Sequence, residues 1–133
     1  MIQVKIKADS RYPVNKEKIR QKVSEFLKIK GIDQGVEVSI AVVGSRKMLE
    51  LSRKYLKDNQ MHSVLSFPLE DVQNGRGGGG FITSGQEALP LGDIVISYPQ
   101  ALKQAAEKSV LLDDEIDNLV EHGLKHLLGE HHN

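Results

Sequence analysis

The chain has 133 residues, no cysteine, and equal numbers of acidic and basic side chains. This length suits one domain with a real hydrophobic core, and the lack of cysteine excludes disulfides and thiolate metal sites. No apolar run approaches the ~20 residues that span a bilayer, and the N-terminus alternates in polarity instead of forming a signal-peptide core. We therefore expect a soluble, cytoplasmic, single-domain protein over residues 1–133.

The net charge of zero hides an asymmetry between the two halves of the chain. Residues 1–57 contain 14 Lys and Arg against 6 Asp and Glu, whereas residues 58–133 contain 4 against 12. The basic half is suited to a polyanion, and the acidic half is suited to surrounding a cation. The alternative is that the two halves pair with each other or only solvate their own helices.

The first half of the chain predicts two strands and two helices. Strict alternation of apolar and polar residues predicts strands over residues 2–7 and 36–42. Between them, Asn15 can cap an amphipathic helix that Gly31 ends. A second helix begins at Ser45 and ends within residues 56–59, and we assign its apolar stripe to core packing.

The second half predicts two strands separated by a long loop, and then two helices. A short strand over residues 63–67 is stopped by Pro68, and the apolar run over residues 91–96 indicates a central strand covered on both faces. Residues 70–90 lack periodicity and contain no Lys-Ser/Thr pair of a phosphate-binding loop, so we expect a hairpin extension or a disordered flap. Ser97 can cap the next helix, and the last helix begins near Asp113.

This order of elements predicts an α+β fold, a single domain with one small four-stranded mixed sheet packed by about four to five helices. Gly123 lies inside the last helix, where glycine costs about 1 kcal/mol relative to alanine. We expect a close approach of the helix to another backbone to offset that cost.

Four of the five histidines lie in the last twelve residues. His122 and His126 are four apart, so on a helix their imidazoles lie on one face and can share one ion. Gly129 can end the helix in a left-handed turn and return His131 or His132 toward the pair. Three nitrogen ligands with an open fourth position are typical of catalytic zinc, which predicts a metal-bearing C-terminal helix. The alternative is a two-histidine site followed by a frayed tail.

The histidine spacing also matches the zinc-peptidase signature His-Glu-x2-His-x2-Gly-x2-His, except at one position. Gly123 stands where that signature has the glutamate that acts as general base. Glu121 does not replace it, because it lies about 100° round the helix, on the far side from His126. A peptidase with this ligand set would lack its base.

Three segments, in the same order along the chain, resemble the YbeY endoribonuclease family. Residues 122–132 resemble its zinc signature His-Gly-x-Leu-His-Leu-x-Gly-Tyr-Asp-His, and residues 63–68 resemble its Thr-Asp-Val-Leu-Ser-Phe-Pro segment. Residues 91–97 resemble its Leu-Gly-Asp-Ile strand. The resemblance covers most of the chain. It implies a zinc-dependent, single-strand-specific endoribonuclease that acts in rRNA maturation and ribosome quality control.

The resemblance also implies site residues and partners. His122, His126 and His132 would hold one Zn²⁺ per chain, and His131 is the alternative third ligand. His62 would lie near the site as proton donor or fourth ligand, unless it is an ordinary polar strand end. The partners would be single-stranded RNA of an rRNA precursor and the small ribosomal subunit, with neither DNA nor a membrane expected.

One departure concerns the cation that would hold the scissile phosphate. Leu56 stands where the family has an arginine with an inferred catalytic role. Another cation would then be needed, and Arg53, Lys54 and Lys57 are near enough in sequence to serve. A zinc ion held by three neutral imidazoles would lower the pKa of its bound water to roughly 7 and polarise a phosphoryl oxygen.

Other departures leave more than one function open. His62 and Ser63 stand where the family has Thr-Asp, and Glu130 and His131 stand where it has Tyr-Asp. The first hypothesis is a metal-dependent endoribonuclease. The second is a non-catalytic, metal-stabilised module that binds the ribosome or RNA through its basic half. The third is a zinc peptidase or other metallohydrolase, which the ligand spacing favours and Gly123 opposes.

Overall fold

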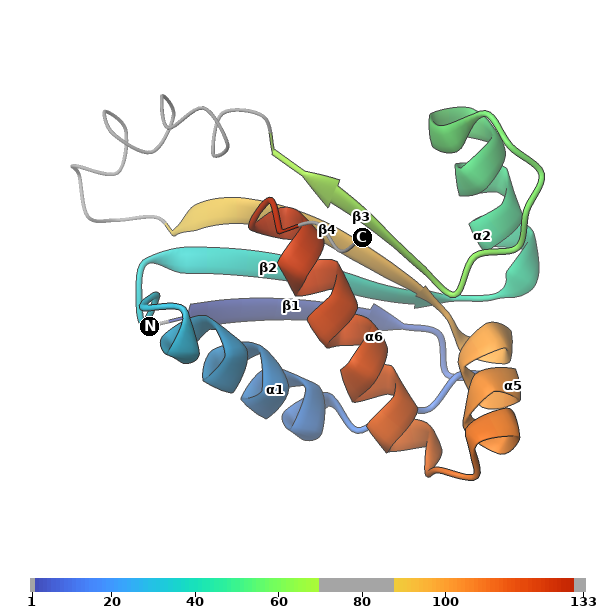
Figure 1. Ribbon diagram of the computed structural model, residues 1–133, viewed down its shortest axis with the longest axis horizontal. Helices are drawn as coiled ribbons and strands as arrows, with labels where there is room; N and C mark the ends of the chain where they lie inside the picture. Colours follow the sequence, from blue (N-terminus) through green and yellow to red (C-terminus); the bar gives the residue numbers. More distant parts are fainter. Residues whose placement is uncertain (1, 70–87, 131–133) are drawn as a thin grey trace.

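The computed structural model describes residues 2–69 and 88–130. The elements follow one another as the sequence predicts (Figure 1): β1 (Ile2–Ala8), α1 (Lys16–Ile29), β2 (Val36–Val43), α2 (Ser45–Leu51), η1 (Ser52–Leu56), β3 (Val64–Pro68), β4 (Leu89–Ser97), α5 (Tyr98–Lys108) and α6 (Leu112–Leu127). Most of the expected loop over residues 70–90 falls outside the described residues. β4 begins at Leu89, two residues before the predicted strand.

The four strands form one mixed sheet in the order β1-β2-β4-β3. β1, β2 and β4 are parallel, and β3 pairs antiparallel with β4 at the sheet edge. The predicted α+β fold with a small four-stranded mixed sheet is therefore confirmed. β4 holds the central position that its apolar run indicates, and Pro68 ends an edge strand, where its missing amide hydrogen breaks no central ladder.

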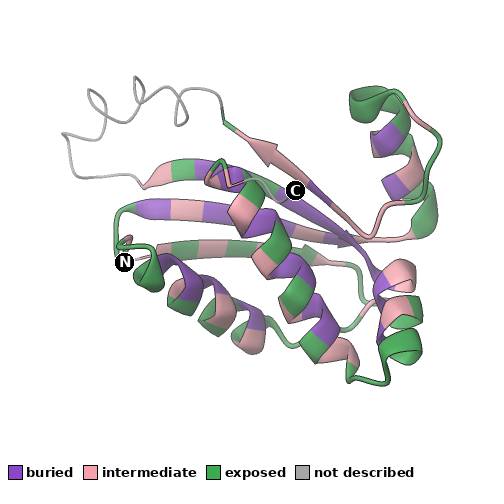
Figure 2. Cartoon of the chain, viewed as in Figure 1, coloured by how far each residue is buried: buried purple, intermediate pink, exposed green. Residues whose placement is uncertain are grey.

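Helices α1 and α6 pack side by side on one face of the sheet (Figure 1). Val38 and Ile40 of β2 face these helices and belong to the main core. On the other face, Met48 of α2 packs with Leu65 and Val95 in a smaller core. Figure 2 shows buried residues along β2 and β4, whereas β1 at the edge alternates between half-buried and exposed residues.

The helix ends follow the predicted capping residues. The side chain of Asn15 accepts a hydrogen bond from the first turn of α1, and that of Ser97 does the same for α5. Gly31 and Gly129 follow α1 and α6 with φ angles of +84° and +78°. Since glycine adopts this left-handed conformation at little cost, the sequence locates both helix ends.

The second helix differs from the prediction in its last turn. α2 passes at Ser52 into the π-helical turn η1, and Lys57 ends it with a φ of 60°. The Ser52 hydroxyl donates to the carbonyl of Met48 at 3.0 Å inside the protein. None of the described helices is long and apolar enough to cross a membrane.

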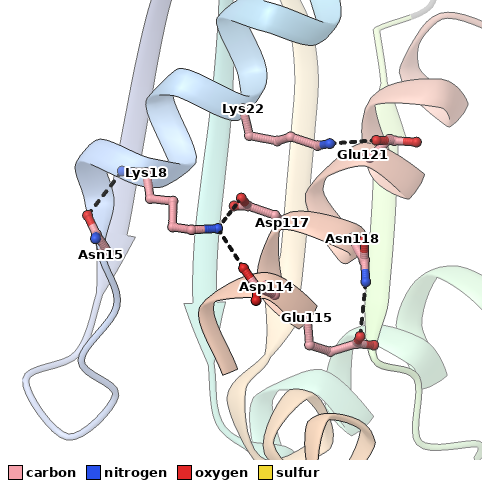
Figure 3. A network of polar contacts seen from close by, with 8 residues as sticks. All are labelled: Asn15, Lys18, Lys22, Asp114, Glu115, Asp117, Asn118 and Glu121. Atoms are coloured by element: carbon pink, nitrogen blue, oxygen red, sulfur yellow. Dashed lines mark hydrogen bonds and ion pairs between the residues drawn. The ribbon is translucent and has the colours of Figure 1, made fainter. Parts of the chain in front are cut away.

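The basic and acidic halves of the chain meet where α1 packs against α6, and we call these ion pairs the α1/α6 seam (Figure 3). The ammonium of Lys18 lies 3.1 Å from the carboxylate of Asp114 and 2.6 Å from that of Asp117. Lys22 lies 2.7 Å from the carboxylate of Glu121. Part of the basic half is therefore used to hold two helices together, and the charges of Lys18 and Lys22 are paired with carboxylates of α6.

We expect the α1/α6 seam to make the free energy of unfolding depend on pH. Hydrogen bonds with Asp117 and Asp114 raise the pKa of Lys18, so its contribution is present below its ordinary pKa and is lost as pH rises through the raised value. The hydrogen bond with Lys22 lowers the pKa of Glu121, so its contribution is present above pH 4.5 and is lost as pH falls through the lowered value. Urea denaturation of Lys22→Met should show about 0.5 kcal/mol less stability at pH 7, and a shrinking difference toward pH 3.

Lys28→Met is the matched control for this measurement. Lys28 lies on the last turn of α1 and forms no ion pair within residues 2–69 and 88–130. Its replacement should leave the pH profile unchanged. A difference between Lys22→Met and the unaltered chain that stays constant across the pH range would contradict the electrostatic account.

Candidate active site

The candidate site lies on the exposed side of α6, where His122 and His126 point away from the core. Both histidines are exposed, whereas Gly123, Leu124 and Leu127 between and after them are buried. The two rings stack with centroids 5.5 Å apart and planes 27° apart. Helical spacing therefore places two imidazoles side by side, as the sequence predicts.

Gly123 allows this part of α6 to lie close to the sheet. A Cβ atom at this position would lie 2.8 Å from a side-chain carbon of Ile94 on β4. The hydroxyl of Ser66 on β3 donates to the carbonyl of Gly123 at 3.4 Å. We expected Gly123 to let α6 approach another backbone. Instead, the branched side chain of Ile94 lies against Gly123 and fills the space under the helix.

Gly92 on β4 lies where β3, β4 and the end of α6 pack together. Its φ is +145°, and a Cβ atom here would lie 2.5 Å from the carbonyl oxygen of Phe67 and 2.8 Å from Leu127. Gly92 and Gly123 are therefore both needed for close packing between α6 and the sheet. Together they allow α6, β3 and β4 to pack closely, with His122 lining the same groove as Val64 of β3.

A polar groove of about 510 Å³ adjoins His122. Residues of α5, α6 and the entry to β3 line it, including Ser63, Val64, Gln104, Lys108 and Asn118. Hydroxyl, amide, ammonium and carboxylate groups from three elements, among them Glu107 and Glu115, converge here beside His122. Such a concave site with a few polar groups is suited to binding part of a polar ligand.

Glu115 is a buried carboxylate at this groove, held by the exposed side chains of Lys108 and Asn118. Its side chain is 1% exposed, and its two carboxylate oxygens lie 3.0 and 2.9 Å from the ammonium of Lys108. Asn118 donates a further hydrogen bond at 3.3 Å (Figure 3). Because a buried carboxylate needs such partners, the pair and the amide are fixed in place. The sequence analysis missed the groove, and the only available signal was that Asn118 lies four residues before His122.

Glu121 faces α1 and not the histidine pair (Figure 3). Its carboxylate oxygens lie 2.7 Å from the ammonium of Lys22 and 3.4 Å from that of Lys125. These ion pairs hold it on the far side of α6 from the groove. This position agrees with the expectation that Glu121 does not act as a general base for a metal at the histidines.

His62 lies at the entry to β3, where its Nε2 is 3.2 and 3.3 Å from the carboxylate oxygens of Asp58. The next residue, Ser63, lines the groove with His122. The role of His62 as proton donor or fourth ligand stays a prediction. Asp58 was not foreseen as its partner, because no regular spacing links the two residues outside a helix.

The cations predicted to hold phosphate lie around η1. Arg53 donates to the side chain of Asn59 at 2.8 Å, and the ammonium of Lys54 lies 5.2 Å from the ring centre of Tyr55. Leu56 is 46% exposed. Neither Arg53, Lys54, Lys57 nor Leu56 is among the described residues that line the groove beside His122. Their contact with RNA stays a prediction.

The histidine pair fits two of the three expected zinc ligands. The ring centres of two imidazoles on one tetrahedral zinc lie roughly 5 Å apart, close to the separation of His122 and His126. His131 and His132 lie outside the described residues, so the third ligand stays a prediction. Within residues 2–69 and 88–130, no three His, Asp or Glu side chains form a metal-binding group.

Comparisons with known proteins match almost the whole chain to one family. A family model described as Endoribonuclease YbeY matches residues 3–133. A Dehalococcoides mccartyi protein of that name is 34% identical over 134 residues, which cover 98% of this chain and 84% of the relative. A Bacillus cytotoxicus protein of the same name is 34% identical over 114 residues, which cover 86% and 71%.

A solution structure from Thermotoga maritima shares the fold. It aligns with a TM-score of 0.59 and 23% identity over all of this chain and 75% of its own. At that identity the likeness concerns the fold alone.

Proposed function

The chain belongs to the YbeY endoribonuclease family, and from this premise we propose that residues 1–133 form one zinc-dependent domain that cleaves single-stranded RNA. We further propose that it acts in the cytoplasm, in rRNA maturation and ribosome quality control, with the small ribosomal subunit as partner. The observation that supports the proposal best is the stacked pair of His122 and His126 beside a polar groove.

We propose that His122, His126 and His132 hold one Zn²⁺ ion per chain. When bound, zinc supplies a water with a pKa of roughly 7 and a Lewis acid for a phosphoryl oxygen. The exposure of His122 and His126 suits this role, since a long polymer needs an accessible site.

The groove residues would bind and orient the RNA strand. The amides of Gln104 and Asn118 and the hydroxyl of Ser63 offer donors and acceptors to ribose and base edges. Unpaired bases expose these edges, whereas a duplex hides them, which supports a preference for single strands. Asp58 orients the ring of His62, and an oriented imidazole is suited to giving a proton to the leaving oxygen.

Two observations favour a second candidate, a non-catalytic module that binds the ribosome or RNA. Leu56 offers no charge where the family has arginine, and it is 46% exposed. Ser63 offers a hydroxyl where the family has a carboxylate. A zinc peptidase is less well supported, because Ile94 occupies the space that a glutamate at position 123 would need.

Removal of zinc tests the proposal. We expect the metal-replete protein to cut a labelled single-stranded rRNA precursor fragment and to leave the same fragment intact when it is annealed to its complement. Chelation followed by dialysis should reduce cleavage to background, and about one equivalent of Zn²⁺ per chain should restore it. Gel electrophoresis measures cleavage, and fluorescence anisotropy measures binding. Metal-replete protein that binds these fragments without cutting any of them would favour the non-catalytic module.

A further inference from the structure

A second hollow, of about 640 Å³, lies on the face of the sheet opposite α6. On this face Met48 of α2 packs against Leu65 and Val95, which covers part of β3 and β4. Ser39 and Ala41 of β2 form part of the floor of the hollow. Within the described residues, α2 and η1 thus leave a recess beside them, over β1, β2 and parts of β4 and β3.

Aromatic side chains form one wall of this hollow. Tyr55 of η1 and Phe67 of β3 meet edge to face, with ring centroids 5.1 Å apart and planes 61° apart. Tyr55 is 53% exposed. The ammonium of Lys54 lies 5.2 Å from the centre of the Tyr55 ring. An exposed aromatic ring beside a cation is the arrangement with which proteins stack an unpaired base and contact its phosphate.

Lysines of β1 form the opposite wall. Lys5 and Lys7 are two apart on a strand, so both side chains point to this face, roughly 7 Å apart along β1. Lys5 is 66% exposed and lies 3.5 Å from Glu37. Lys7 forms no ion pair within residues 2–69 and 88–130. Asp93 lies in the lining as well, so two ammonium groups face one carboxylate there.

We propose that this hollow is a second RNA-binding surface, the sheet-face platform, formed by Lys5, Lys7, Tyr55 and Phe67. A base of the strand that flanks the cleaved segment stacks on Tyr55, and the two lysines bind its phosphates. This inference rests on the proposed function, because it takes the same RNA as ligand.

The position of β3 allows one RNA strand to reach both sites. β3 is the edge strand of the sheet. Ser63, just before it, lines the groove beside His122, and Phe67 lines the platform. Residues four apart on an extended chain are about 13 Å apart. A strand that leaves the groove therefore reaches the platform by passing round the edge of β3.

The lining favours RNA over a protein partner. Two lysines, an aspartate and a serine lie among the apolar and aromatic residues that line this hollow, whereas the centre of a protein interface is depleted of charged residues and of lysine in particular. Single-stranded RNA matches both the cations and the exposed ring, since its phosphates and its base faces are available at every nucleotide.

Two variants test the platform by fluorescence anisotropy with a single-stranded RNA of about 20 nucleotides. Tyr55→Leu keeps apolar contact with Phe67 but removes the stacking ring, and Lys5→Gln with Lys7→Gln removes two charges. Each should weaken binding of the long RNA about 10-fold. For the lysine variant, the slope of log Kd against log salt should fall by roughly 1.4, as expected for two lost phosphate contacts.

The matched control is Lys28→Gln with Lys103→Gln, which removes two exposed charges from α1 and α5. This control should bind the long RNA as the unaltered chain does. Cleavage of a short RNA that fills only the groove should be unchanged in all three proteins. Circular dichroism and thermal unfolding of every variant establish that the fold is intact.

The outcomes separate this inference from the proposed function. If the unaltered chain cleaves short RNA but both platform variants bind long RNA with unchanged affinity, the platform is wrong and the proposed function stands. If the unaltered chain cleaves nothing while the platform variants lose affinity, the platform stands and the proposed function fails. Loss of a concentration-dependent dimer in the variants, with RNA affinity unchanged, would assign the hollow to a second copy of the chain and overturn the proposal.

Discussion

The His126→Ala protein is expected to bind no zinc and to cleave RNA at least about 1,000-fold more slowly than the unaltered chain. Loss of the ion would remove both the activated water and the stabilisation of charge on the phosphate, which together justify this magnitude. His126 is exposed on α6, so alanine at this position creates no cavity. Elemental analysis after gel filtration and initial rates on a single-stranded RNA measure the two effects.

Two neighbouring substitutions identify the third ligand. The resemblance assigns His132, so His132→Ala should lose zinc as His126→Ala does. His131→Ala is the matched control, because it removes the same group from the adjacent position, and it should retain about one zinc per chain. The reverse result would make His131 the ligand. A His126→Ala protein that keeps its zinc would show that the metal is bound elsewhere.

Gly92→Ala is expected to reduce the free energy of unfolding by about 3–5 kcal/mol, a large part of the 5–15 kcal/mol typical of a domain. The new Cβ atom would lie 2.5 Å from the carbonyl oxygen of Phe67, which is backbone and cannot rotate away, and 2.8 Å from Leu127. The positive φ of +145° adds strain for any residue with a side chain. Urea denaturation followed by circular dichroism measures the loss.

Gly35→Ala separates the clash from the backbone strain. Gly35 also has a positive φ, of +78°, but nothing lies within 4 Å of the position of its Cβ atom. This variant should lose only about 1–2 kcal/mol, the cost of the left-handed conformation. Equal losses in the two proteins would show that strain alone acts at Gly92, and that the contact among β3, β4 and α6 is not tight.

Local signals in the sequence account for most of the fold. Asn15 and Ser97 accept hydrogen bonds at helix starts, and Gly129 follows a helix in the left-handed conformation, because these preferences depend only on nearby backbone. The side-by-side placement of the His122 and His126 rings also follows from local geometry, because residues four apart on a helix lie on one face. The unbroken apolar run over residues 91–96 also identified β4 as a central strand.

Contacts between distant segments could not be read from such signals. Glu115 is one of three acidic residues in the first turn of α6, a pattern typical of an exposed helix start, yet it is buried against Lys108 of the preceding helix. Ile94 appeared as an ordinary strand residue, yet it fills the space under Gly123. The groove beside His122 depends on how α5 packs against α6, and single-sequence patterns do not contain that information.

The two edge strands of the sheet carry features that oppose aggregation. An exposed strand edge offers unpaired amide and carbonyl groups to another chain, and proline or lysine on that edge discourages such pairing. β3 is five residues long and ends at Pro68, and β1 presents Lys5 and Lys7. The lysines that we assign to RNA therefore also help to keep separate copies of the chain from joining edge to edge, so the two tasks constrain the same positions of β1.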